Sequence, residues 1–102
     1  MNPVERAMAI GKAQVLYLRA VRFRGHNSVK APTALQVVPI VDALGDEKLL
    51  DLFIESQFAK MPGEWCKEKF GTLYPPANVV FGGEAMSRYR EYVSSGQRVP
   101  CW

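Results

Sequence analysis

The N-terminal quarter of the sequence narrows the choice of fold, because its apolar residues recur with the period of an α-helix. Asn2 followed by Pro3 is typical of a helix start, since asparagine caps exposed N–H groups and proline has no N–H to satisfy. Gly25 is a typical stop. We therefore predict a helix over residues 2–25. As a strand, the segment would mix arginine with apolar side chains on both faces, which does not suit a half-buried strand.

The apolar residues of this helix fall into two stripes on different sides. The first stripe consists of Val4, Met8, Gly11, Val15 and Leu18, and the second of Ala9, Ala13, Leu16, Ala20 and Phe23. A helix at the edge of a small domain needs a single apolar stripe, so two stripes indicate two packing partners. One interpretation is that the rest of the chain covers both. The interpretation we adopt is that the alanine-rich second stripe binds a partner, because small side chains let another helix approach closely.

Four further segments show helix signals. Thr33 and Gln36 form a capping box before an almost wholly apolar stretch, in which Pro39 should kink or break a helix. Residues 47–61 form the clearest helix, since large apolar side chains share one face. These side chains are Leu49, Leu50, Phe53, Ile54, Phe58 and Met61. Shorter helices are predicted over residues 62–71 and 84–94.

Together these segments predict one small domain over residues 1–102 that is mostly α. We expect a compact bundle of four or five helices. A short extended segment at residues 35–41 or 77–81 is the alternative for those residues, because β-branched side chains favour strands. A chain of 102 residues is long enough to bury a single thin core.

Charge is distributed unevenly along the chain, although the net charge is only +3. Residues 1–33 contain six basic residues and one acidic residue, whereas residues 34–60 contain two basic and five acidic residues. Glu47, Asp51 and Glu55 form an acidic stripe at helical spacing. Three basic residues, Arg19, Arg22 and Arg24, either pair with this stripe or bind an acidic surface of a partner protein. We expect them to bind the partner.

Residues that could carry catalysis or bind a metal are scarce. The sequence has two cysteines, Cys66 and Cys101, and one histidine, His26, and the spacing of these residues does not match a zinc site. We therefore expect two free thiols, no enzyme activity, no metal and no cofactor. The sequence has no apolar run long enough to span a bilayer and no signal-peptide pattern at its N-terminus, so we expect a cytoplasmic protein without a membrane partner.

The remaining features favour a binding protein over an enzyme. Trp65 and several other large apolar residues lie outside any single core pattern, and exposed apolar patches commonly mark interfaces. We predict a regulator that binds another protein, as small bacterial or phage inhibitors and antiactivators do, and that forms a homodimer. The predicted protein-binding residues are Ala9, Ala13, Leu16, Arg19, Ala20, Arg22, Phe23, Arg24 and Trp65. The alternative is a small basic regulator that binds nucleic acid through residues 19–30.

Overall fold

The predicted N-terminal helix is α1, Pro3–Phe23, in a computed structural model that describes residues 1–96. Asn2 caps the helix, because its side-chain oxygen accepts a hydrogen bond from the Glu5 N–H at 2.8 Å. Gly25, just beyond the end of the helix, has a φ of +93°, a conformation that glycine adopts without strain. The local start and stop signals of the sequence therefore set the bounds of α1.

The other elements are also helical. They are α2 (Ala34–Leu44), the 3-10 helix η1 (Glu47–Leu49), α3 (Leu50–Lys60), α4 (Gly63–Phe70), α5 (Ala77–Val80) and α6 (Ala85–Ser95). Residues 1–96 contain no strand, which confirms the prediction of a mostly α bundle. The extended alternative is wrong both for residues 35–41, which lie within α2, and for residues 77–80, which form the single turn of α5.

Helix α2 continues through a proline that was expected to kink or break it. The predicted capping box is present: the Gln36 N–H donates to Thr33 Oγ1 at 3.2 Å, and the Thr33 N–H donates to Gln36 Oε1 at 2.9 Å. Pro39 lies on the exposed side of the helix. Its missing N–H would have bonded the carbonyl of Leu35, a residue that is 86% exposed, so water can reach this end of the helix instead. The capped start and the apolar inner face keep the helix intact.

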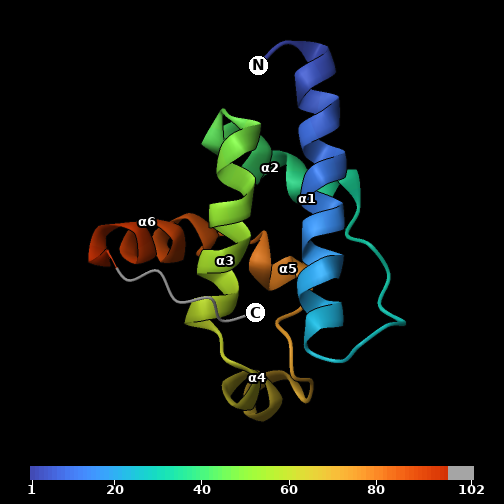
Figure 1. Ribbon diagram of the computed structural model, residues 1–102, viewed down its shortest axis with the longest axis vertical. Helices are drawn as coiled ribbons and strands as arrows, with labels where there is room; N and C mark the ends of the chain where they lie inside the picture. The colour runs from blue at the N-terminus through green and yellow to red at the C-terminus, as the bar shows by residue number, and fades with distance from the viewer. Residues whose placement is uncertain (97–102) are drawn as a thin grey trace.

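Helices α1 and α3 lie side by side along the long axis of the molecule, with α2 behind them (Figure 1). Helix α6 packs on α3 and projects away from α1, whereas α4 lies at the end of the molecule where α1 finishes. The predicted apolar face of residues 47–61 is confirmed across η1 and α3, since five of its six residues are at most 1% exposed and Leu49, in η1, is half-buried. The ring of Tyr17 packs on Phe58 and Phe81, with centroids 6.1 and 6.0 Å apart. The core therefore lies between α1, α2, α3 and the short α5.

The two stripes of α1 have the opposite orientation from the one we predicted. Ala9, Ala13 and Ala20 are fully buried and Leu16 is 4% exposed, so the second stripe faces the core apart from Phe23 at its end. The prediction that these four residues are available at the surface is wrong. The alanines do allow helices to approach closely, but the helices are α2 and α3 of the same chain. The first stripe faces outward, apart from Leu18 at its end, which is partly buried and packs against the core.

Candidate protein-binding surface

The side of α1 that faces away from the core carries a row of exposed apolar residues. Val4, Met8 and Val15 are 69%, 66% and 63% exposed, and Met1 is 44% exposed. Gly11 lies between Met8 and Val15 at the same helical spacing, so the row continues across it. Met1, Val4, Met8, Gly11 and Val15 together form the outer face of α1.

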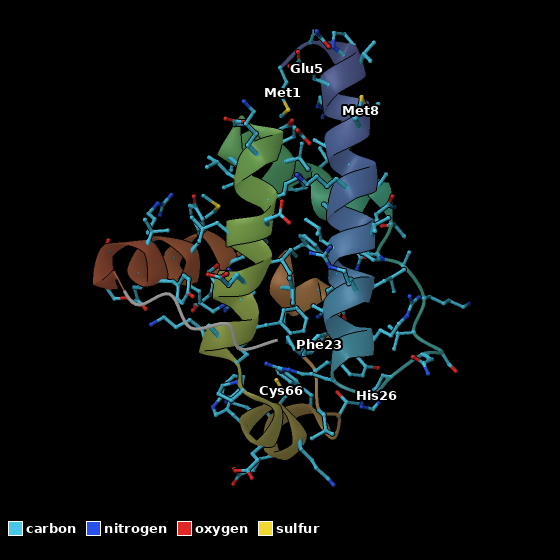
Figure 2. All side chains as sticks on the ribbon, in the orientation of Figure 1. Met1, Glu5, Met8, Phe23, His26 and Cys66 are labelled. Carbon is cyan, nitrogen blue, oxygen red and sulfur yellow. The ribbon has the colours of Figure 1, made fainter. Side chains whose placement is uncertain are left out.

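The first turns of α1 extend beyond the ends of α2 and α3 (Figure 1). Residues 1–8 are all exposed, so this part of the helix buries no side chain in the core. Met8 lies on this projecting part of the helix (Figure 2). A short helix without tertiary packing is marginally stable in water, so the projecting turns need other support.

Two polar contacts supply part of that support. The Asn2 cap satisfies one N–H of the first turn. The Arg6 guanidinium donates to both carboxylate oxygens of Asp42, at 2.8 and 3.0 Å, and so ties the projecting turns to the end of α2. This hydrogen bond holds the pKa of Asp42 below its usual range. Both contacts are exposed to solvent, and neither covers the outer face.

Gly11 is an unusual residue for the middle of a 21-residue helix. Glycine inside a helix costs roughly 0.5–1 kcal/mol of stability relative to alanine. Elsewhere a close neighbour can require glycine, but no other part of the described chain lies within 4 Å of the position that a Cβ atom at Gly11 would take. The packing of this chain therefore gives no reason for a glycine here.

The basic residues beside the outer face partly neutralise the predicted acidic stripe. The Lys12 ammonium lies 3.1 Å from Asp51 and 3.5 Å from Glu47, and Arg19 lies 3.7 Å from Asp51. The pairing with Asp51 raises the pKa of Lys12. Glu55 instead accepts a hydrogen bond from the Tyr92 hydroxyl at 2.7 Å. Arg19 thus pairs within the chain, whereas the sequence led us to expect an acidic partner.

The Arg24 side chain makes its hydrogen bonds to the main chain of the same protein and does not belong to a docking surface. Its guanidinium donates to the main-chain oxygens of Phe58 and Met61, both at 2.8 Å, and of Leu73 at 3.1 Å. The same group lies 4.9 Å from the centre of the Phe58 ring. These contacts join the end of α1 to the end of α3 and to the segment after α4. The expectation that Arg24 meets a partner is therefore not supported by its position.

The aromatic residues predicted to bind protein lie away from the outer face. Phe23, which is 74% exposed, lies at the opposite end of α1 from Met8 (Figure 2). Trp65 is 41% exposed on α4, where its ring meets the edge of Phe70 at a centroid distance of 5.8 Å. Arg22 is exposed near Phe23 in the sequence. The predicted binding residues are therefore not brought together into one surface.

A buried polar network between α3 and α6 was missed by sequence reasoning. Gln57 is fully buried, donates to the Ala85 carbonyl at 2.9 Å and accepts from Arg88 Nε at 2.6 Å. Arg88 also donates to the Val79 carbonyl at 2.6 Å, and burial lowers the pKa of its guanidinium. A signal for this network was available, because Gln57 lies four residues after Phe53 on the apolar face of α3. The hydrogen bonds of Gln57 and Arg88 join parts of the same chain and so hold α6 against α3.

Cys66 and His26 are the described members of the three residues that the sequence offered for catalysis or metal binding. Cys66 is fully buried, its thiol donates to the Met61 carbonyl at 3.2 Å, and burial raises its pKa. The His26 ring meets the edge of Tyr74, with centroids 4.7 Å apart. The described residues contain no group of three or more side chains that could hold a metal ion. Cys101, the other predicted free thiol, lies outside the described residues.

Comparisons with known proteins leave the outer face of α1 as the main indication of function. No family model matches the sequence, and no curated protein or solved structure matches it either. Within residues 1–96, no helix has both the length and the apolar character needed to cross a membrane. The functional argument therefore depends on the surface chemistry of this chain.

Proposed function

We propose that this protein is a non-enzymatic regulator that binds another protein chain in the cytoplasm, of the same kind as small bacterial or phage inhibitors and antiactivators. The binding surface in this proposal is the outer face of α1. The observation that supports it is the row of exposed apolar residues on the side of α1 opposite the core. Small monomeric proteins rarely expose contiguous apolar patches without an interaction to cover them.

The spacing of the row suits recognition through one face of a helix. Val4, Met8 and Val15 are separated by one and two helical turns, which is the pattern of an amphipathic helix seated in a groove or against another helix. Methionine adds a flexible side chain that adapts to irregular surfaces. Full burial of a valine or methionine side chain is worth about 1.5–3 kcal/mol. Since each of the three is about two-thirds exposed, docking them would contribute roughly 3–6 kcal/mol before the cost of association.

The nucleic-acid alternative has less support because the structure uses part of the basic cluster internally. Arg24 binds main-chain carbonyls, and Arg19 lies beside Asp51. Each cation that is already paired contributes less to the release of counterions from phosphate. The cluster at residues 19–30 therefore offers fewer cations to a nucleic acid than its composition suggests.

Site-specific photo-crosslinking tests the proposal in cells that make the protein. Benzoylphenylalanine at position 15 should give an adduct of discrete mass, and the change Met8→Glu in the same chain should abolish it. Val93, which is 46% exposed on α6, provides the control position for the crosslinker and, as Val93→Glu, the control substitution. Equal crosslinking from positions 15 and 93, or an adduct that Met8→Glu leaves unchanged, would contradict a binding role for the outer face.

A further inference from the structure

We infer that the chain covering the outer face of α1 is a second copy of this protein, and that the two α1 helices cross antiparallel at Gly11. This inference depends on the proposed function, because it names the partner of the same surface. It differs from the homodimer predicted from the sequence, which used the stripe that proves to be buried.

The position of Gly11 in the row is the first argument. Val4 lies seven residues before Gly11 and Leu18 lies seven residues after it, so an antiparallel pair centred on Gly11 places Val4 of one copy near Leu18 of the other, whose side chain is partly buried against its own core. The same crossing places Met8 beside Val15 of the other copy. Glycine at the crossing point lets two helix backbones approach closely. The open space above Gly11 in a single chain is the space that the second helix would fill.

Charge along the helix is the second argument. Glu5 is exposed beside the first half of the outer face, whereas Arg22 is exposed beside the second half. An antiparallel pair brings Glu5 of each copy toward the basic end of the other, and the two helix dipoles oppose each other favourably. A parallel pair would place like charges side by side. The charge pattern therefore favours the antiparallel arrangement.

The projecting turns are the third argument. In the antiparallel pair, residues 1–8 of each copy lie over the second half of α1 of the other copy, so each projecting segment gains the packing that its own chain does not give it. Both copies use the same patch, as a closed twofold dimer requires. The patch is a single helix face, which is smaller than standard interfaces. We therefore expect a dissociation constant in roughly the micromolar to millimolar range.

Sedimentation equilibrium of the purified full chain, loaded over roughly micromolar to millimolar concentrations, tests for the dimer. We expect Met8→Glu and Gly11→Glu each to raise the dissociation constant about tenfold or more. Gly11→Glu should leave the melting temperature of the monomer unchanged or raised, because the site is open and glutamate is a better helix former than glycine. Val93→Glu on α6 is the control and should leave the dimer intact.

Disulfide trapping tests the crossing point in a Cys101→Ser background. Gly11→Cys should oxidise to a covalent dimer, because only a residue at the twofold axis lies next to itself. Met8→Cys should not do so alone, but it should couple to Val15→Cys when the two variants are mixed, because the crossing places these two exposed positions side by side. A wild-type protein that stays monomeric at millimolar concentration overturns the inference, as does a dimer that Gly11→Glu and Met8→Glu leave intact. If that monomer still gives a Met8-dependent crosslink to a different protein in cells, the proposed function stands and only the identity of the partner is wrong.

Discussion

Replacing Arg24 with methionine should destabilise the protein strongly, although the residue belongs to a cluster that looks like a surface patch in the sequence. The guanidinium joins three stretches of main chain through the carbonyls of Phe58, Met61 and Leu73. Methionine keeps an unbranched apolar stem of similar length, so the change removes mainly the hydrogen bonds and the contact with the Phe58 ring.

The magnitude follows from how exposed each bond is. A hydrogen bond to a charged group contributes about 1.5–3 kcal/mol net. The bonds to Phe58 and Met61 are partly buried, whereas the bond to Leu73 is exposed and contributes little. Water entering the site recovers part of the loss, because the freed carbonyls lie near the surface. We therefore expect Arg24→Met to lower the free energy of unfolding by about 2–4 kcal/mol, and Arg24→Lys by an intermediate amount, because an ammonium group lacks the planar fork.

Urea unfolding followed by circular dichroism at neutral pH measures the effect. A loss of this size should shift the melting temperature of a domain of this length by roughly 10–25 °C. Arg90→Met is the matched control, since Arg90 is exposed on α6 and its removal should change stability by less than about 0.5 kcal/mol. If Arg24→Met unfolds at the same urea concentration as Arg90→Met, the structural role assigned to Arg24 is wrong.

Two further substitutions test other parts of the packing. Gly82→Ala should cost about 1–3 kcal/mol, because the added Cβ would collide with the Asn78 carbonyl oxygen, whereas Gly83→Ala meets open space and should not lower the melting temperature; identical melting of the two variants would contradict this. Tyr17 donates its buried hydroxyl to the Pro75 carbonyl at 2.9 Å, and burial raises its pKa. The raised pKa means that the stability gained from the neutral phenol is present below about pH 10 and is lost as pH rises further. Between about pH 9 and about pH 11, the urea midpoint should therefore fall more steeply for the wild type than for Tyr17→Phe, and equal slopes would refute the assignment.

The helix bounds could be predicted because they depend on local chemistry. The Asn2 cap, the stop at Gly25, and the capping box at Thr33 and Gln36 each act within a few residues, and all four residues occupy the predicted roles. For the single turn of α5 the sequence left both a helical and an extended conformation open, since four residues are too few to establish a period. Pro39 was given too much weight, because a capped helix with an apolar inner face tolerates one missing bond on its exposed side.

The orientation of α1 could not be predicted from its own residues. Periodicity shows that two stripes exist, but the position of α2 and α3 decides which of them is buried. Alanine made the second stripe resemble an interface, and the same small size suits a core in which two helices approach one side of α1. Arg24 was misjudged for a related reason. Its acceptors are main-chain carbonyls, which have no sequence pattern.

The projecting turns of α1 have a consequence for how tightly the outer face can bind. A surface that frays is competent only while its helix is formed, and the apparent dissociation constant rises as the competent fraction falls. Asn2 and the Arg6–Asp42 pair hold the first turns in helical form without lying on the outer face themselves. Affinity is therefore adjustable from outside the contact surface. Loosening either support would make docking a folding event, in which part of the binding energy goes into ordering the first two turns.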